Sequence, residues 1–320
     1  MKPISSLSII IPVYNEQDNL SLLHESLVST LAQIDYDYEV IYVDDGSSDT
    51  SFTLLEQLAL QDAKVKVIRF TRNYGQTAAI AAGIDHADGD AVIFMDADMQ
   101  NDPTDIPMML AKLNEGYDVV SGWRKHRQDT WLTRTLPSQL ANWLISKITK
   151  VYLHDYGCTL KVYRREMLQG YRLYGEMHRF LPAYAAQVGA KIVEVPVKHH
   201  PRRYGQSKYG LERTFKVILD LFTVKFLNSY AQKPIYVFGS VGVILILSSF
   251  LLVSSLLIRK ILYGYSLVTN PLLMMSVMFI ILGVQSIFMG LIGELLVRTY
   301  YESQDKHTYS IGQLLNIRKD

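Results

Sequence analysis

The chain has 320 residues, which is enough for one sizeable hydrophobic core and an additional element. Its formal net charge of +1 excludes the strongly basic surface that is typical of nucleic-acid-binding proteins. The single cysteine, Cys158, excludes an intramolecular disulfide and fits a reducing compartment. The apolar run at the N-terminus is too short for a signal peptide and ends at Pro12, so we interpret it as a first strand.

From about residue 5 to residue 197, short β-branched runs alternate with helical patterns. Continuous apolar runs of this length predict parallel strands that are buried on both faces. Strands are expected at residues 7–13, 38–45, 65–70, 90–98 and 117–123, and helices at residues 18–31, 51–60 and 77–87. This alternation predicts a doubly wound α/β domain, whose ligands bind beyond the carboxyl ends of the strands.

Three of these strands end in polar clusters, at residues 14–16, 44–46 and 96–98. In a parallel sheet they should converge on one cleft. Two carboxylates one residue apart, Asp96 and Asp98, can share a hard divalent cation that also binds diphosphate oxygens, and Gln100 adds a neutral oxygen. The alternative is an acidic pair that only caps a turn.

The clusters after the first two strands suit a nucleoside. Asp45 can accept hydrogen bonds from a base or a ribose, while Tyr14 offers a flat face and Glu16 an acceptor. The alternative is that these residues belong to simple strand-to-helix turns. We expect Ser47 or Ser48 to cap the following helix.

A basic, glycine-containing loop occupies residues 202–208. Arginine forks match phosphate oxygens, so Arg202, Ser207 and Lys208 are candidate phosphate ligands. The alternative is a basic stretch that only attracts anionic lipid. A second set of basic residues follows the strand at 117–123: Arg124, Arg127 and Arg134.

Apolar stripes at helical spacing lie beside basic residues in two segments, about 135–152 and 209–231. This pattern is typical of helices that lie in the membrane interface. For the first segment, an ordinary helix packed on the sheet is an equal alternative. The second segment leads directly into a span: residues 234–258 carry no charge, and residues 271–297 carry only Glu294. Both are long and apolar enough to cross a bilayer as helices.

The motifs PVYNE, VDDGSSD, DADMQ, SGWR and RRYGQSKYG together resemble those of inverting nucleotide-sugar transferases with the GT-A fold. More narrowly, the chain is similar to dolichol-phosphate mannose synthases and to bacterial polyprenyl-phosphate (bactoprenol) glucosyltransferases. The resemblance runs from about residue 10 to residue 208, and the two C-terminal spans match the glucosyltransferase subgroup. It implies a Rossmann-like, doubly wound mixed sheet in a catalytic domain at residues 1–208. A juxtamembrane helix at 209–231, two transmembrane helices at 232–298 and a cytoplasmic tail at 299–320 follow.

The resemblance also implies roles by position. Pro12, Tyr14, Glu16 and Asp45 would hold the nucleoside; Asp96, Asp98 and Gln100 would hold Mg²⁺ or Mn²⁺; and Arg202 would hold the donor diphosphate. Arg124, Arg134, Ser138 and Lys208 would hold the acceptor phosphate. Asp155 is a further candidate near the reacting centre, with a turn before Gly157 as its alternative.

The implied reaction moves one sugar, with inversion, from a nucleotide sugar to undecaprenyl or another polyprenyl phosphate. A phosphate monoester is largely dianionic at neutral pH because its second pKa is about 6, so it needs positioning more than a strong base. UDP-glucose is favoured by subgroup resemblance alone. The chain lacks the Gln-x-x-Arg-Trp motif of processive synthases, which argues against a polymer product. A scaffold that only binds nucleotide is a second alternative.

We expect a multi-pass protein of the cell membrane with both termini in the cytoplasm, because nucleotide sugars are cytoplasmic and two spans return the chain to its starting side. The tail after Arg298 is polar and short, and we expect it to be amphipathic or loosely ordered. The oligomeric state stays open: Gly283, Gly290 and Gly293 permit close helix contacts, but small residues are frequent in such spans anyway.

Overall fold

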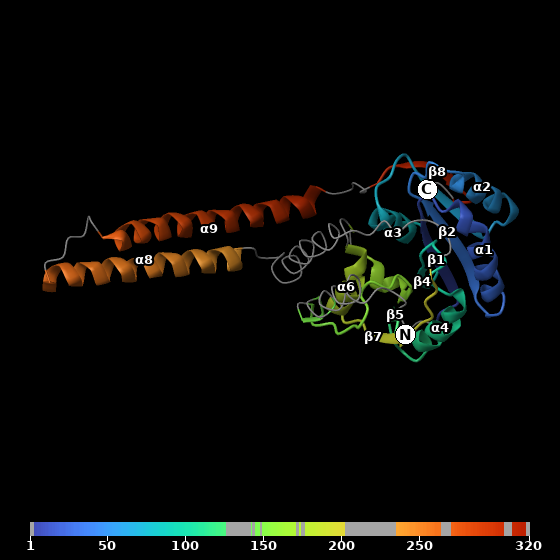
Figure 1. The fold of residues 1–320 in the computed structure, drawn as a ribbon, viewed down its shortest axis with the longest axis horizontal. Helices are drawn as coiled ribbons and strands as arrows, with labels where there is room; N and C mark the ends of the chain where they lie inside the picture. The colour runs from blue at the N-terminus through green and yellow to red at the C-terminus, as the bar shows by residue number, and fades with distance from the viewer. Residues whose placement is uncertain are drawn as a thin grey trace. The chain divides into compact units, whose positions relative to one another are not determined.

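The computed structural model describes residues 3–125, 142, 145–147, 149–170, 173, 177–201, 235–263, 270–303 and 309–317 (Figure 1). It divides into two compact units. The first unit combines Met1–Leu221 with His307–Asp320, and the second is Phe222–Lys306. The last residues of the chain therefore belong to the same unit as the N-terminal domain.

The first unit is built on one eight-stranded mixed sheet with the order β7-β5-β6-β4-β1-β2-β3-β8. The central strands β1 to β4 are parallel to one another, whereas β6 and β8 run antiparallel to their neighbours. The strands are β1 (Ser6–Val13), β2 (Asp37–Asp44), β3 (Val65–Phe70), β4 (Ala91–Phe94), β5 (Val119–Trp123), β6 (Lys161–Arg164), β7 (Ile192–Pro196) and β8 (Ile311–Leu315).

Helices cover both faces of this sheet, as its buried central strands require. Ile9 and Ile11 of β1 belong to the core that β1 forms with α1 (Gln17–Leu31), α2 (Ser51–Gln61) and α4 (Ile106–Asn114). Ile10 points to the opposite face, where it meets Gly83 of α3 (Gln76–Asp85) so closely that a Cβ there would lie 2.4 Å from its methyl carbon. The shorter helices are η1 (Pro103–Asp105), η3 (Arg165–Leu168), η4 (Met177–Phe180) and α6 (Leu181–Gln187).

The predicted α/β fold is confirmed, with all five expected strands and all three expected helices within a few residues of their predicted bounds. Three strands, β6, β7 and β8, were not predicted. The expectation of a loosely ordered tail is wrong for residues 309–317, because β8 pairs with β3 and its Leu315 packs on the core.

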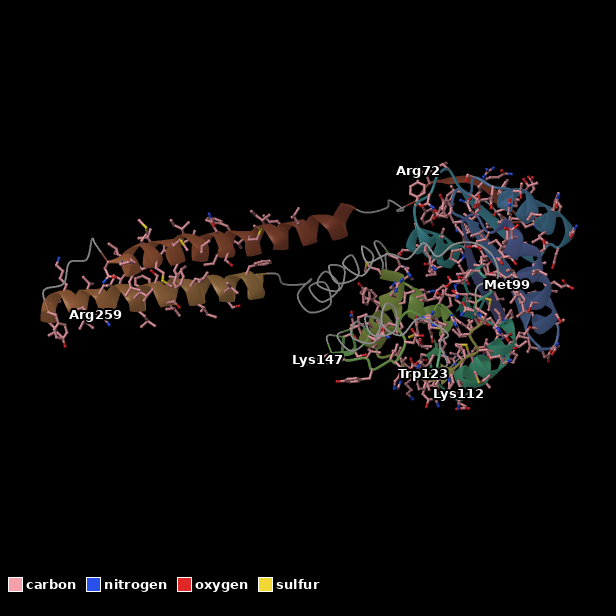
Figure 2. The ribbon with its side chains drawn as sticks, viewed as in Figure 1. Arg72, Met99, Lys112, Trp123, Lys147 and Arg259 are labelled. Atoms are coloured by element: carbon pink, nitrogen blue, oxygen red, sulfur yellow. The ribbon has the colours of Figure 1, made fainter. Side chains whose placement is uncertain are left out.

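The second unit is an antiparallel pair of apolar helices, α8 (Ile235–Tyr263) and α9 (Pro271–Ser303). The helices approach closely at Gly242 and Gly283, where a Cβ on either residue would lie within 3 Å of the other's carbonyl oxygen. Buried serines add contacts: Ser249 Oγ donates to the carbonyl of Ser276 at 2.7 Å. Most of the remaining surface is apolar and exposed (Figure 2). Both helices contain a segment long and apolar enough to cross a membrane, Phe238–Tyr263 and Pro271–Gly293.

Candidate active site

The carboxyl ends of β1, β2, β4 and β5 lie at one edge of the sheet. β1 pairs in parallel with both β2 and β4, and β5 has the direction of β4 because both are antiparallel to β6. The polar clusters that follow these strands in the sequence therefore meet along one edge, as predicted.

The loops after β1 and β2 are joined by hydrogen bonds. The backbone N–H of Asn15 donates to Ser47 Oγ at 3.0 Å, and Ser48 N–H donates to Asn15 Oδ1 at 2.8 Å. Glu16 N–H donates to Ser51 Oγ at 2.9 Å. The expectation that Ser47 or Ser48 caps the next helix is therefore wrong: α2 has no side-chain cap at Thr50, and these serines hold the neighbouring loop instead.

The predicted nucleoside residues line this joined edge. Pro12 lies in β1 opposite Val43, and Tyr14 is partly buried in the loop that follows. The carboxylate of Glu16 accepts a hydrogen bond from Asn19 Nδ2 at 2.7 Å, which orients it at the start of α1.

Asp45 is almost fully buried, and both of its carboxylate oxygens accept backbone hydrogen bonds. Tyr74 N–H donates to Oδ1 at 2.6 Å and Gly75 N–H donates to Oδ2 at 2.9 Å. Asp45 thus fixes the β3–α3 loop, residues 71–75. Its neighbour Asp44 accepts from Ser47 N–H, and burial raises its pKa above the ordinary value.

Asp96 and Asp98 lie directly after β4, in a turn where Met99 adopts a positive φ of 60°. Asp96 accepts hydrogen bonds from Gln76 Nε2 at 2.8 Å and from Thr159 Oγ1 at 2.6 Å. Asp98 Oδ1 accepts the backbone N–H of Gln100 at 3.1 Å. Burial and the charge of Asp98 raise the pKa of Asp96 to about 6. The site therefore disfavours two bare carboxylates side by side.

This carboxylate pair fits a divalent cation. Oxygen ligands suit Mg²⁺ and Mn²⁺, and a cation between the two carboxylates would offset the repulsion that raises the pKa of Asp96. Among the described residues, no group of three acidic, histidine or cysteine side chains is arranged to hold a metal. Further ligands would then have to come from neutral groups such as Gln100 or from a bound diphosphate.

The segment before the basic loop reaches this turn. His200 N–H donates to the carbonyl of Gln100 at 3.0 Å, and His199 forms a bridge with Asn101. Arg202 follows Pro201, the last described residue of this segment. The predicted residues Arg134, Ser138, Arg202, Ser207 and Lys208, together with the helix at 209–231, lie outside the described residues.

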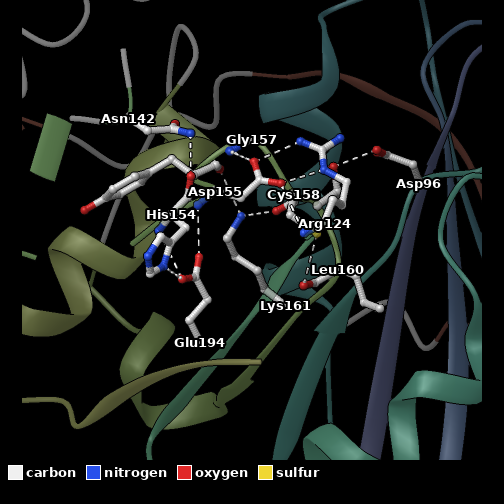
Figure 3. A network of polar contacts seen from close by, with 12 residues as sticks. Asp96, Arg124, Asn142, His154, Asp155, Gly157, Cys158, Leu160, Lys161 and Glu194 are labelled. Carbon is white, nitrogen blue, oxygen red and sulfur yellow. Dashed lines mark hydrogen bonds and ion pairs between the residues drawn. The ribbon is translucent and has the colours of Figure 1, made fainter. Parts of the chain in front are cut away.

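Arg124 and Asp155 form a bidentate ion pair at the carboxyl end of β5 (Figure 3). The Nε and Nη2 atoms of Arg124 donate to the two carboxylate oxygens at 2.7 and 2.9 Å. Asp155 Oδ1 also accepts Gly157 N–H at 3.1 Å, which is the turn that the sequence offered as the alternative. Burial opposes the charge on Arg124, but the hydrogen bonds and charge of Asp155 raise its pKa above the usual value.

Backbone contacts and a second acid hold this pair in place. Glu194 Oε1 accepts Asp155 N–H at 2.9 Å, and its Oε2 accepts His154 N–H at 3.0 Å (Figure 3). Lys161 is buried and donates to the carbonyls of Tyr156 and Cys158. The loop that carries Asp155 is thus fixed from β6 and β7, two strands absent from the predicted set.

Described residues between 142 and 149 contact the same loop, and three of them are buried: Asn142, Ile145 and Ser146. Asn142 Nδ2 donates to the carbonyl of His154 at 2.7 Å, and Thr149 Oγ1 contacts Tyr156 Oη at 3.1 Å. The described residues of this segment therefore contact the loop that carries Asp155, and whether the segment is an interfacial helix stays a prediction.

A small pocket adjoins Asp96, and most of its polar lining was not singled out from the sequence. A Cβ at Gly157 would lie 3.2 Å from Arg124 Nη2 and 3.8 Å from Arg179 Nη1, so two guanidinium groups flank this glycine. The lining residues are Gln76, Ile80, Phe94, Tyr156, Gly157, Cys158, Thr159, Lys161, His178 and Arg179. A sequence signal exists for only some of them: Gln76 follows β3, and Thr159 and Lys161 lie at the start of β6.

The profile of the family described as Glycosyl transferase family 2 matches residues 8–172. The match covers half of the chain and all four strand ends of the site. The chain belongs to this family, and it is a glycosyltransferase of the polyprenyl-phosphate sugar transferase group with a GT-A-like mixed sheet.

Curated relatives extend the similarity over the whole chain. The chain is 40% identical over 320 residues to "Dodecaprenyl-phosphate galacturonate synthase" of Rhizobium johnstonii, covering 98% of this chain and 95% of the relative. It is 36% identical over 318 residues to "Undecaprenyl-phosphate 4-deoxy-4-formamido-L-arabinose transferase" of Proteus mirabilis, covering 99% and 96%. The matched length includes both apolar helices and the tail.

Among solved structures, the first unit resembles glucosyl-3-phosphoglycerate synthase from Mycobacterium tuberculosis in complex with Mn²⁺, uridine diphosphate and phosphoglyceric acid. The TM-score is 0.54 at 19% identity, with 70% of this chain and 78% of the other covered. The likeness supports the fold.

Proposed function

We propose that the protein transfers one sugar, with inversion, from a nucleotide diphosphate sugar to a polyprenyl phosphate, using a divalent cation. The observation that carries this proposal is the pair of carboxylates at the edge where four strands end, the partly buried Asp96 and the buried Asp98. Full-length similarity to two transferases whose names specify dodecaprenyl or undecaprenyl phosphate supports the acceptor.

We assign the donor to the edge formed by β1, β2 and β4. Tyr14, Glu16 and Asp45 would contact the nucleoside, since their loops are joined and lie beside the carboxylate pair. Asp96, Asp98 and Gln100 would hold Mg²⁺ or Mn²⁺. The cation supplies charge stabilisation for the departing nucleotide diphosphate. Arg202, which follows the segment bonded to Gln100, would add a guanidinium to the same phosphates.

We assign the acceptor phosphate to the basic residues Arg134 and Lys208 and to the hydroxyl donors Ser138 and Ser207. Because the phosphate is already largely dianionic at neutral pH, these residues need only align it for in-line attack on the anomeric carbon. Arg124 donates two hydrogen bonds to Asp155, so we propose that the pair acts as a unit that shapes this end of the site.

The sugar is better assigned to a hexuronate than to the glucose that subgroup resemblance favoured. The pocket beside Asp96 is lined by Lys161, His178 and Arg179. Lys161 is buried and donates to the carbonyls of Tyr156 and Cys158, and the guanidinium of Arg179 lies beside Gly157 in the pocket lining. A guanidinium beside this pocket suits a sugar carboxylate. The relative from Rhizobium johnstonii is named for galacturonate. A uridine base is proposed from the resemblance alone.

A donor comparison tests the sugar assignment. Purified full-length protein is incubated with undecaprenyl phosphate, Mn²⁺ and either UDP-galacturonate or UDP-galactose, which differ only in the carboxylate. We expect preference for the uronate, and Arg179→Ala should lower kcat/KM for it about 10- to 100-fold, the range of a charge-assisted hydrogen bond, with little effect on galactose.

The matched control is Arg165→Ala, since Arg165 donates to the carbonyl of Asp88 away from the pocket. It should leave both donors unchanged. A parent enzyme that uses UDP-galactose as well as UDP-galacturonate would contradict the uronate assignment.

We propose that the domain and both termini face the cytoplasm. The proposal is supported by β8, which follows the second apolar helix and pairs with β3, so that the chain before the first apolar helix and after the second contributes to one sheet. A tag placed after Asp320 should therefore be accessible only in opened cells. Access from outside intact cells would contradict this topology.

A further inference from the structure

The C-terminal strand β8 extends the catalytic sheet at its β3 edge, although residues 71–310 separate the two strands in sequence. The register pairs Val67 with Leu315 and Phe70 with Ile311, and it shifts between Arg69 and Phe70. An edge strand can be paired in this way by any compatible segment. Here the pairing segment follows both apolar helices in the sequence.

Tyr309 and Ser310 fix the end of this strand that lies nearest the active site. The ring of Tyr309 stacks on Phe70 with 5.1 Å between centroids, and its hydroxyl donates to Asp85 Oδ2 at 2.6 Å. The carbonyl of Ser310 accepts Thr71 N–H at 3.1 Å. The tail therefore contacts the last residue of β3, the first residue of the β3–α3 loop, and the last residue of α3, the helix that follows this loop.

Asn316 fixes the other end. Its Nδ2 donates to the carbonyls of Ala59 at 2.7 Å and Val65 at 2.9 Å, and it lies 3.4 Å from that of Asp62. These acceptors belong to the end of α2 and the start of β3. The segment is thus attached at both of its ends as well as along its length.

The β3–α3 loop connects the tail to the donor carboxylates. Tyr74 packs edge-on against Phe70 at 5.6 Å, and its hydroxyl contacts Thr71 Oγ1 at 3.2 Å. The backbone N–H groups of Tyr74 and Gly75 hold Asp45, and the next residue, Gln76, holds Asp96. One short loop therefore sets the orientation of both carboxylates.

We propose that the C-terminal segment 309–317 is a positioning element of the donor site. It holds the β3–α3 loop in the conformation in which Asp45 and Asp96 are oriented for the nucleotide sugar. Without it, the loop would sample other conformations, and the apparent affinity for donor would fall in proportion to the competent fraction. This inference rests on the proposed function, because it assigns the donor to these carboxylates.

Two measurements on the full-length protein test the inference. The first is hydrogen–deuterium exchange of the amides of residues 71–76, which requires no substrate. The second is binding of UDP with Mn²⁺ by calorimetry, together with KM and kcat for donor and acceptor. Tyr309→Ala should speed exchange in this loop and weaken UDP binding about fivefold, the factor that corresponds to a stacked aromatic pair. The donor KM should rise equally, with kcat and the acceptor KM within about twofold.

Two further variants distinguish a loss of loop positioning from a general loss of folded structure. Tyr309→Phe keeps the stacking on Phe70 and should recover most of the donor affinity. Gln313→Ala, at an exposed side chain on the same strand, should change neither measurement. The melting temperature of each variant shows whether the sheet is intact.

Unchanged exchange in Tyr309→Ala would overturn the inference whatever the enzyme's substrate. Faster exchange with unchanged UDP binding would also overturn it, because the loop would then not serve the donor. If the proposed function itself failed, the parent protein would transfer no sugar, while the exchange result would still report on the tail and the loop.

Discussion

Replacing Asp155 by alanine should release the guanidinium of Arg124 from its two hydrogen bonds and leave Gly157 N–H without its acceptor. The side chains of Arg124 and Asp155 are only 14% and 3% exposed, so water cannot fully replace the lost partner. Removing one member of a buried ion pair costs about 3–5 kcal/mol. For a domain of this size that corresponds to a fall in melting temperature of roughly 6–20 °C.

The double variant tests whether Arg124 and Asp155 act together or independently. Arg124→Ala combined with Asp155→Ala removes both charges, so its stability should be higher than the sum of the single losses predicts, by roughly 0.5–3 kcal/mol. In transfer assays each single variant and the double variant should lose a similar factor, about 100-fold, because all three misplace the same loop.

The assays are thermal unfolding in detergent and initial rates with saturating donor and acceptor. Asp155→Asn is the conservative control, since its amide oxygen can still accept Gly157 N–H. The reasoning would be refuted if the rate loss of the double variant equalled the product of the losses in the two single variants. That result would show that Arg124 and Asp155 contact the substrate separately.

Three other predictions concern the donor and the acceptor. Asp98→Ala should abolish transfer and leave the melting temperature nearly unchanged, and full activity of this variant in the presence of a chelator would contradict the metal assignment. Arg202→Lys should restore little of the activity that is lost in Arg202→Ala, because an ammonium cannot reproduce a bidentate contact with phosphate. Equal rates for the lysine variant and the parent enzyme would contradict this. Replacing Phe215 and Phe222 by aspartate should raise KM for a long-chain polyprenyl phosphate but not for a short, water-soluble prenyl phosphate. Equal losses with both acceptors would instead place these phenylalanines in the core of the catalytic domain.

The convergence of the site could be predicted from sequence because it follows from sheet geometry. Asp45 and Asp98 come directly after strongly apolar runs, and parallel strands bring their carboxyl ends to one edge. The positions of these residues therefore needed no knowledge of side-chain packing.

What could not be predicted depends on partners distant in the chain. The motif IGQLL is a weak strand pattern, and β8 forms only because β3, more than 200 residues earlier, offers an unpaired edge. The contact of Asp155 with Arg124, and of Gln76 with Asp96, likewise joins residues that no local pattern links. Ser47 illustrates the same limit, since its position suggested a helix cap but its hydroxyl bonds to Asn15 across the site.

The most direct test of the proposed function is the mass of the lipid product. Purified protein is incubated with undecaprenyl phosphate, Mn²⁺ and UDP-galacturonate, and the extracted lipid is analysed by mass spectrometry with a chelated sample in parallel. We predict a single species heavier by one hexuronate, absent in chelator and absent in Asp98→Ala. A ladder of longer saccharides, or release of UDP and free sugar with no change in the lipid, would contradict the assignment as a polyprenyl-phosphate transferase of one sugar.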